Sequence, residues 1–379
     1  MDKFGFVKLK DVCNINMGQS PDSDSYNDNE DGIPFFQGNA DFGEKYPTTR
    51  KWCNAPTKIA HAEDILISVR APIGALNYAK EECCIGRGLA AITPNQDKVS
   101  SGFIYWLLKG KHKELNLQGT GSTFKAISRK VLEEIKVPDI ELKKQTELAG
   151  SLEKVYSVIQ LRKQQLEELD ILIKARFVEM FGDPVSNPFN YDKVRLLQIA
   201  DIKIGPFGSL LHKEDYIENG HPLVNPSHIV DSKISVDNKL TISNEKYEEL
   251  GAYKLQIGDV VMGRRGEMGR CAVVLEDGLL CGTGSILIRP TQNVTADFIQ
   301  KIISFPSFKK TIEDMAVGQT MPNLNVPIVS NFEIIHPPVE VQKSYYDFVT
   351  QVDKLKVEVQ KSLDEMQILF DSLMQEYFG

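Results

Sequence analysis

The chain has 379 residues, of which 42% are hydrophobic and 25% are charged, and its formal net charge is −8. It is long enough for two globular domains, and no apolar run reaches the ~20 residues that a membrane span needs. The start of the chain, Met1-Asp2-Lys3-Phe4, lacks the features of a secretory signal, and the six cysteines form no CxxC pair, so we expect a cytoplasmic protein with reduced thiols and no membrane contact.

The negative charge argues at first against a nucleic-acid partner, but its distribution weakens that argument. Residues 1–140 are neutral, with 18 basic and 18 acidic side chains, whereas residues 340–379 hold 4 basic and 8 acidic ones. Basic residues form local groups, namely Lys109–Lys113, Lys125 with Arg129-Lys130, and Arg264-Arg265 with Arg270. Such groups are usually solvated surface, and a basic face is only the first observation that DNA binding requires. The six histidines are scattered, so no metal site is predicted.

The first predicted domain, residues 1–140, is mostly strand with a few short helices. The run Asp64–Val69 is rich in β-branched residues and ends before Arg70-Ala71-Pro72, which predicts a strand. A short helix is predicted over Phe103–Leu108, and the glycine-rich stretch Gly119–Ser122 predicts a loop.

A long helix is predicted next, over about Lys143–Phe181 within a region spanning 141–182. Its seam follows alternating spacings of four and three, at Leu148, Leu152, Val155, Ile159, Arg162, Leu166, Leu169, Ile173, Arg176 and Met180. A mainly apolar seam sustained over this length predicts a coiled coil. The helix stops at Phe181-Gly182, and Asp183–Pro188 is a linker, because two prolines in six residues cannot continue a helix.

The second predicted domain, residues 183–338, resembles the first in its pattern. Strands are predicted over Cys271–Leu275 and Ser285–Ile288, a short helix over Phe298–Ser304, and a loop at Val317–Thr320. A second long helix is predicted from about Val341 to the C-terminus, within a region spanning 339–379.

The chain repeats itself. Adding 197 to each seam position of the first helix gives the seam of the second helix, at Tyr345, Val349, Val352, Lys356, Val359, Leu363, Met366, Phe370, Leu373 and Tyr377. The repeat extends upstream with shifts of 187 to about 199, which match Gly18 to Gly205, Pro34–Gln37 to Pro222–Asn225, Asp64–Ile67 to Asp259–Met262, Arg70 to Arg265, and Gly86-Arg87-Gly88 to Gly282-Thr283-Gly284. Varying shifts are expected of a shared fold whose loops differ in length.

These patterns predict an α+β chain in which two similar, mainly-β domains are separated by two long helices. If the two seams pack on each other, the helices form an antiparallel coiled coil, and the repeat gives the chain a pseudo-two-fold axis like that of a homodimer. A helix of ~39 residues is roughly 58 Å long, which is long enough to hold two DNA-reading domains apart. The polar seam residues Arg162 and Lys356 either fix the register or extend to solvent; both alternatives stay open.

With these patterns the sequence resembles the specificity subunits of type I restriction–modification systems. The resemblance covers the whole chain and depends on the domain–helix–domain–helix order together with several stretches, namely Pro34–Asn39, Asp64–Arg70, the glycine-rich loops at 119–122 and 318–320, Pro138 with Glu141, and the Phe-Gly helix ends. No single motif among them is diagnostic.

The resemblance implies that each globular domain is a target recognition domain that reads one half of an asymmetric bipartite site in double-stranded DNA. The helices would fix the spacer and dock two methyltransferase (modification) subunits, which restriction subunits join. S-adenosylmethionine, ATP and Mg²⁺ would belong to those partners, so that this chain is non-catalytic and binds no cofactor. Apolar residues away from the seam, such as Leu161, Ile171 and Val178, would suit partner docking.

Enzyme signatures are weak. Asn187-Pro188-Phe189-Asn190 has one of the two prolines of an adenine-methyltransferase element, and no glycine-rich cofactor loop accompanies it. Pro138–Lys143 contains the letters of a nuclease motif, but it compresses the carboxylates into one turn, and the second copy, Pro337–Gln342, lacks both the Asp and the Lys.

Residues in loops at matched places in the two copies are the best candidates for DNA contact, because Arg favours guanine, Asn and Gln favour adenine, and Lys, Ser and Thr mainly hold phosphate. In the first domain the predicted DNA-binding residues are Gln37, Asn39, Arg70, Arg87, Ser122, Thr123 and Lys125. In the second domain they are Asn225, Ser227, His228, Arg264, Arg265, Thr283, Gln319, Thr320 and Asn323.

Two other functions remain open. A stand-alone sequence-specific DNA-binding protein, such as a repressor, would bind DNA tightly without a methyltransferase partner, and it would need more positive charge than this chain carries. A two-domain protein-binding scaffold would show no salt-dependent DNA binding at all.

Overall fold

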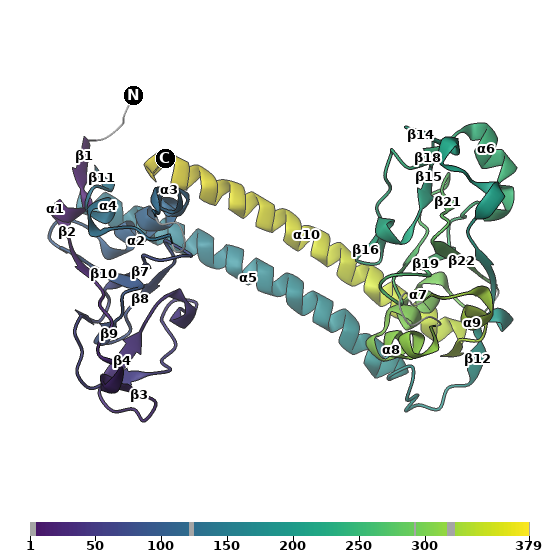
Figure 1. Cartoon of the computed structure of the whole chain (residues 1–379), viewed down its shortest axis with the longest axis horizontal. Helices are drawn as coiled ribbons and strands as arrows, with labels where there is room; N and C mark the ends of the chain where they lie inside the picture. The colour runs from purple at the N-terminus through teal and green to yellow at the C-terminus, as the bar shows by residue number, and fades with distance from the viewer. Residues whose placement is uncertain (1–4, 121–124, 292, 317–322, 379) are drawn as a thin grey trace. The chain divides into compact units, whose positions relative to one another are not determined.

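The computed structural model describes residues 5–120, 125–291, 293–316 and 323–378, and the chain divides into two compact units (Figure 1). Unit 1 consists of residues 1–165 and 359–379, and unit 2 of residues 166–358. Each unit therefore contains one globular part together with one portion of each long helix.

Unit 1 has its strands in the globular part, and they are, in chain order, β1 (Gly5–Lys8), β2 (Cys13–Met17), β3 (Tyr26–Asn27), β4 (Ile33–Phe36), β5 (Trp52–Cys53), β6 (Ile59–Ala60), β7 (Ile65–Ser68), β8 (Leu76–Tyr78), β9 (Cys83–Ile85), β10 (Leu89–Pro94) and β11 (Lys136–Asp139). Its short helices are α1 (Leu9–Val12), α2 (Ser101–Gly110), α3 (His112–Gln118) and α4 (Arg129–Glu133), with 3-10 turns η1 (Ser23–Ser25) and η2 (Asn39–Asp41).

Two sheets form the frame of unit 1. The first is antiparallel with the order β2-β10-β7-β8, and the second has the order β3-β5-β4-β9-β6, in which β4 and β9 run parallel (Figure 1). A separate two-stranded ladder pairs β1 with β11.

Strand β7 is buried on both faces, and its alternating side chains enter two different cores. Ile65 and Ile67 pack in a core with residues of α2, whereas Leu66 packs in a second core with Phe36 and Ile85 of the other sheet. Successive side chains of a strand point to opposite faces, so the first sheet is a middle layer between helices and the second sheet. This double burial explains why the sequence of β7 is a continuous apolar run.

Unit 2 has the strands β12 (Lys193–Arg195), β13 (Ala200–Ile204), β14 (Tyr216–Ile217), β15 (His221–Val224), β16 (Ile229–Val230), β17 (Lys233–Ile234), β18 (Thr241–Ile242), β19 (Val260–Gly263), β20 (Cys271–Val273), β21 (Leu280–Cys281), β22 (Ser285–Pro290) and β23 (Glu333–Ile335). Its helices are α6 (Asn244–Glu249), α7 (Ala296–Ser304), α8 (Pro306–Met315) and α9 (Val326–Ser330), with 3-10 turns η3 (Leu196–Gln198), η4 (Gly208–Leu210), η5 (Lys213–Asp215), η6 (Pro226–His228) and η7 (Gly251–Tyr253).

The topology of unit 2 repeats that of unit 1, which confirms the internal repeat and the α+β class. Its antiparallel sheet has the order β13-β22-β19-β20, its second sheet β14-β18-β15-β21 again contains a parallel pair, β15 with β21, and β12 pairs with β23. The alternation of side chains is also repeated, because Val260 and Met262 of β19 enter one core and Val261 enters another.

The two long helices are α5 (Leu142–Phe181) and α10 (Val339–Phe378). All twenty predicted seam positions are buried or half-buried. Inside unit 1 the helices run antiparallel, because Lys144 lies over the ring of Tyr377 and Tyr156 contacts Phe370.

Unit 2 shows the same antiparallel contact between its portions of α5 and α10. The Tyr345 hydroxyl donates to the Ile173 carbonyl, and Lys356 pairs with Asp170. The antiparallel packing of the two seams is therefore confirmed within each unit. No helix in the described part of the chain is long and apolar enough to cross a membrane.

Candidate nucleic-acid interface

Three loops converge at one edge of unit 1, where β4, β7 and β9 end. Strands β4 and β9 are parallel, so their C-terminal ends meet at the same edge. The Gly86 amide donates to the Phe36 carbonyl at 2.8 Å, and the Val69 amide donates to the Gly88 carbonyl at 2.9 Å. These bonds hold the segments that carry Gln37, Arg70 and Arg87 beside one another.

A pocket of about 270 Å³ lies between these loops, and its lining consists of Ser20, Tyr26, Gln37, Arg70, Arg87 and Gly88. We call this set the unit 1 cluster. The structure thus brings together three residues that the sequence predicted separately. Among the described residues, no hydrogen bond or ion pair engages the exposed guanidinium groups of Arg70 and Arg87. Two guanidinium groups whose N–H donors have no partner in the described part of the chain are suited to bind phosphate or guanine.

The remaining predicted residues of unit 1 lie around this cluster or outside the described chain. Asn39 begins η2 and is half-buried, while Lys125 is exposed and its carbonyl accepts from the Ala71 amide. Ser122 and Thr123 fall outside the described residues.

Two glycines allow the loops of the cluster to approach this closely. A Cβ atom added at Gly88 would lie 2.3 Å from the Gln37 carbonyl oxygen, and one added at Gly86 would lie 3.1 Å from the Gln37 Cα atom. The Gly-Arg-Gly run therefore presents Arg87 while its neighbours pack against the backbone of Gln37.

Unit 2 repeats this geometry. The Gly282 amide donates to the Val224 carbonyl at 3.0 Å, and the Arg264 amide donates to the Gly284 carbonyl at 3.0 Å, which match the two bonds described for unit 1. Residue equivalences follow from these pairs of bonds and from the strand registers: Asn225 is equivalent to Gln37, Arg265 to Arg70, Thr283 to Arg87 and Tyr216 to Tyr26. We call Tyr216, Asn225, Arg265 and Thr283 the unit 2 cluster.

The unit 2 cluster differs in how its side chains are engaged. Asn225 is half-buried, and its Oδ1 accepts from the Gly284 amide at 3.5 Å. Burial raises the pKa of Tyr216, and a hydrogen bond with the Thr283 side chain opposes that rise. Arg265 is exposed, and no described residue forms an ion pair with it.

The other predicted residues of unit 2 have distinct placements. Arg264 donates through Nε to Asn323 Oδ1 at 3.0 Å, and burial, together with the charge of Arg265, lowers the pKa of Arg264. Ser227 is exposed. Gln319 and Thr320 fall outside the described residues.

His228, unlike Ser227 before it, is buried in the structure. Its side chain is buried, and its Nδ1 lies 2.8 Å from the Leu223 carbonyl oxygen. The ring thus holds the turn η6 after β15.

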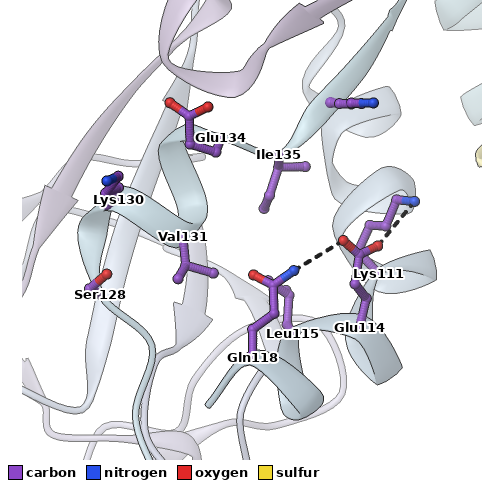
Figure 2. Close-up of a pocket in the computed structure, with 10 residues that line it drawn as sticks. Lys111, Glu114, Leu115, Gln118, Ser128, Lys130, Val131, Glu134 and Ile135 are labelled. Carbon is purple, nitrogen blue, oxygen red and sulfur yellow. Dashed lines mark hydrogen bonds and ion pairs between the residues drawn. The ribbon is translucent and has the colours of Figure 1, made fainter. Parts of the chain in front are cut away.

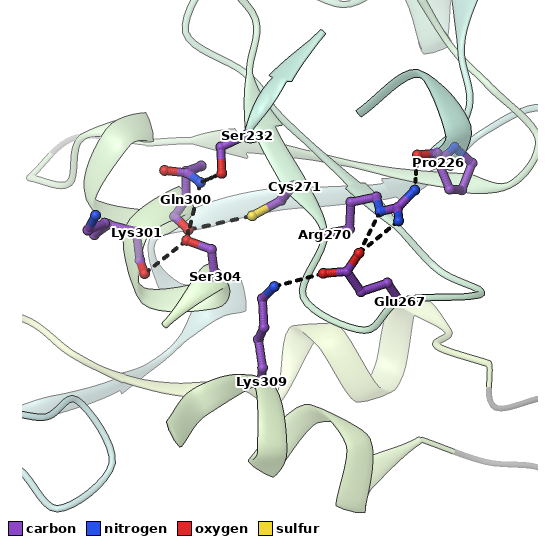
Figure 3. Close-up of polar contacts among 9 residues, drawn as sticks. All are labelled: Pro226, Ser232, Glu267, Arg270, Cys271, Gln300, Lys301, Ser304 and Lys309. Carbon is purple, nitrogen blue, oxygen red and sulfur yellow. Dashed lines mark hydrogen bonds and ion pairs between the residues drawn. The ribbon is translucent and has the colours of Figure 1, made fainter. Parts of the chain in front are cut away.

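An ion-pair network fixes the loop that carries Arg265 (Figure 3). Glu267 accepts from Arg270 at 2.7 Å and pairs with Lys309 of α8 at 3.0 Å, and Arg270 also donates to the Pro226 carbonyl at 3.2 Å. Hydrogen bonds from Arg270 and Lys309 lower the pKa of Glu267. Because Pro226 follows Asn225, this network connects the two loops of the unit 2 cluster.

A larger pocket of about 530 Å³, between α3, α4 and β11, is a weaker candidate (Figure 2). Of the three lysines that line it, Lys111 lies 3.2 Å from Glu114. Its other acid, Glu134, pairs with Lys8 outside the pocket at 2.6 Å. A hydrogen bond from Lys8 lowers the pKa of Glu134. Two carboxylates, Glu114 and Glu134, line this pocket beside its lysines, and their negative charge would oppose the binding of a phosphate.

Sequence patterns missed two residues of the clusters, Tyr26 and Tyr216. Each lies on the edge strand of its second sheet and pairs with a middle strand, β5 or β18. The ring of Tyr26 packs 5.2 Å from that of Phe35, and Lys51 lies over it at 5.8 Å. The two tyrosines are 190 residues apart in the sequence, which falls within the range of the repeat shifts and could have indicated that they are equivalent.

Among the described residues, no group of three or more His, Cys, Asp or Glu could hold a metal ion.

Comparison with known proteins agrees with this duplicated arrangement. The model of the family described as type I restriction modification DNA specificity domain matches residues 1–170 and 188–365. A Methanocaldococcus jannaschii protein named for the specificity subunit of the type I restriction enzyme MjaX is 43% identical over 156 residues, which are 41% of this chain and 37% of that protein. The MjaVIII specificity subunit of the same organism is 21% identical over 282 residues, 69% of this chain and 65% of the relative. The chain thus matches less than two thirds of the length of either relative.

The fold is also that of a solved structure. The crystal structure of a type I restriction–modification system S subunit from M. genitalium superposes with a TM-score of 0.57 at 15% identity, covering 100% of this chain and 97% of that one. At this identity the likeness establishes the fold.

Proposed function

This chain belongs to the family of type I restriction modification DNA specificity domains, and from that premise we propose that it is the DNA-recognition subunit of a restriction–modification complex. In this role each unit reads one half of an asymmetric bipartite site. The chain itself catalyses no reaction; it selects the sequence on which partner subunits act.

One observation carries the proposal: the same edge of each unit holds a cluster of arginine and amide side chains. The units share the backbone bonds that build this edge, but they differ in its side chains, Gln37 and Arg87 in one and Asn225 and Thr283 in the other. Base edges are distinguished by their patterns of hydrogen-bond donors and acceptors. Two units with the same scaffold but different side chains are therefore suited to read two different half-sites.

We assign partner docking to the faces of α5 that point away from the seam. Leu161 and Ile171 are each 62% exposed, and Val178 is 47% exposed. Exposed apolar residues on a helix whose seam is already packed favour a protein partner over solvent. Two methyltransferase subunits, one for each half-site, are the partners that fit a bipartite site, and restriction subunits would complete the complex.

Cofactor chemistry in this proposal belongs to those partners. S-adenosylmethionine would be held by the methyltransferase subunits, and ATP and Mg²⁺ by the restriction subunits. We also propose that the complex works in the cytoplasm, because all six cysteines are buried free thiols, which suits a reducing compartment.

The deciding experiment is co-purification. The full chain would be co-expressed with the methyltransferase encoded beside it, the complex sized by light scattering, and adenine methylation mapped on plasmid DNA. We expect one copy of this chain with two methyltransferase subunits, and methylation at a split, asymmetric sequence.

Two results would contradict the proposal. A chain that remains alone but binds one DNA sequence tightly is a repressor-like protein, and a chain that neither joins the methyltransferase nor binds DNA is a scaffold. Salt dependence separates the last two cases, since phosphate contacts make DNA binding weaken steeply with salt.

A further inference from the structure

The two clusters differ most at one pair of equivalent positions. Arg87 and Thr283 each occupy the middle of a Gly-X-Gly run between the end of a parallel strand, β9 or β21, and the start of β10 or β22. Both side chains are exposed. The amides of Gly86 and Gly282 make matching backbone bonds, and so do the carbonyls of Gly88 and Gly284. The structure therefore places different side chains at the same point of the same scaffold.

The scaffold at this point is tightly constrained. A Cβ atom at Gly282 would lie 2.3 Å from Asn225 Oδ1, and one at Gly88 would lie 2.3 Å from the Gln37 carbonyl. The X residue is therefore held beside the amide residue of each cluster. The side chain of the X residue differs between the units, Arg87 in one and Thr283 in the other. Its backbone is held in place by the flanking glycines and the amide residue.

Arg87 has the chemistry of a guanine reader. It lines the unit 1 pocket together with Arg70 and Gln37, and no hydrogen bond or ion pair from the described residues engages its guanidinium group. A guanidinium fork can donate to both O6 and N7 of guanine in the major groove, whereas adenine presents one acceptor and one donor there.

Thr283 lacks that capacity. Its hydroxyl offers one donor on a short side chain. A single hydroxyl can contact several bases and discriminates weakly among them. The equivalent position of unit 2 therefore lacks the paired donors that select guanine.

We propose that Arg87 is a specificity-determining residue that selects guanine at one position of the half-site read by unit 1, and that Thr283 leaves the equivalent position of the other half-site without a guanine preference. This inference rests on the proposed DNA-recognition function and adds to it the residue and the base.

A reciprocal exchange tests the proposal. The complex of the full chain with its methyltransferase subunits would select from a duplex library randomised in both half-sites, and the bound sequences would be counted. The variants are Arg87→Thr, Arg87→Lys and Thr283→Arg. The exchanged residues are exposed and each occurs naturally at the equivalent position, so both backbones accommodate them.

We expect Arg87→Thr to reduce the guanine preference at one position about five- to a hundredfold while the other half-site stays unchanged. Thr283→Arg should create a guanine preference at the equivalent position of the second half-site. Arg87→Lys should keep more of the affinity than Arg87→Thr but lose much of the preference, because an ammonium lacks the planar fork. Arg50→Thr, which removes an exposed charge of unit 1 outside the cluster, should leave every base preference intact.

The outcomes distinguish the assignment of Arg87 from the proposed DNA-recognition function. If the wild-type complex enriches no sequence, both proposals are contradicted. If it enriches a bipartite site and Arg87→Thr enriches the same site with uniformly lower affinity, Arg87 is a phosphate contact and only the assignment of Arg87 is overturned.

Discussion

The ammonium group of Lys356 lies 2.6 Å from Oδ1 of Asp170, which joins α10 to α5 inside unit 2. The sequence left two roles open for this polar residue in the seam. The structure shows an ion pair whose members are 29% and 55% exposed, so it lies at the solvent edge of the seam.

Asp170→Asn should therefore change stability only slightly. Pairs this exposed contribute about 0–1 kcal/mol and are screened by salt. We expect a loss below about 1 kcal/mol in the free energy of unfolding at low salt, measured by urea denaturation, and no difference at 1 M NaCl. Glu365→Gln, which alters an exposed acid on α10 that has no ion pair among the described residues, is the control. A larger loss that persists in salt would mean that the pair sets the helix register.

Arg265→Ala should weaken DNA binding and relax the preference at one position of the half-site read by unit 2. Its side chain is exposed and has no ion pair among the described residues, so its removal should leave the free energy of unfolding within about 0.5 kcal/mol of wild type. The measurement is binding to a randomised-site library by the full complex. Arg195→Ala removes the same charge from β12 and should relax no preference. Unchanged affinity and unchanged preference for Arg265→Ala would remove this residue from the interface.

Gly88→Ala should distort the unit 1 cluster, because the added methyl group would lie 2.3 Å from the Gln37 carbonyl oxygen. Forced shifts of this kind cost about 1–3 kcal/mol of stability. We expect a lower melting temperature and weaker recognition of the first half-site. Gly38→Ala is the matched control, because its backbone is extended and no atom lies within 4 Å of the added Cβ. Equal melting temperatures for the two variants would argue against the close approach.

Glu267→Gln should remove part of the acid sensitivity of unit 2. Arg270 and Lys309 lower the pKa of the Glu267 carboxyl group in the folded chain. Its stabilisation is thus fully present above the unfolded-state pKa of about 4.3 and is lost as the pH falls through the lower folded-state value. Glu267 is 53% exposed, so the effect should stay below about 1 kcal/mol. Unfolding measured from pH 7 to pH 3 should show a shallower dependence for the variant, and parallel curves would contradict the pairing.

The thiols should be unreactive in the folded protein. Burial raises the pKa of Cys13, Cys83, Cys271 and Cys281 to about 12, and that of Cys84 to about 11. Since the thiolate is the reactive form, iodoacetamide at pH 8 should label the native chain slowly and the urea-unfolded chain quickly. Rapid native labelling of any of them, located by mass spectrometry, would show that the fold opens there.

Local patterns predicted the elements well, whereas the pairing of strands had to come from the structure. The four-three spacing that includes Leu152 and Val352 is a local property of a helix, and it identified both long helices. The parallel pairing of Phe35 with Cys84 joins segments far apart in the chain, and no periodicity specifies it. The pocket that gathers Gln37, Arg70 and Arg87 depends on that pairing.

Single residues were harder to judge than elements. His228 lies in a loop beside polar residues, which favoured an exposed role, but its ring is buried against the Leu223 carbonyl. The tyrosines of the two clusters lie in segments whose repeat shift changes, so that the equivalence of Tyr26 and Tyr216 became clear only from the strand registers.

The last turns of α10 complete the core of unit 1, where Phe378 packs on Phe103 and Phe370 on Trp106. A ribosome therefore finishes every residue of unit 2 before it has made the segment that closes unit 1. The core of unit 1 therefore stays incomplete until residues 359–379 are made. A gene fragment that encodes unit 2 is continuous, whereas one that encodes unit 1 is interrupted.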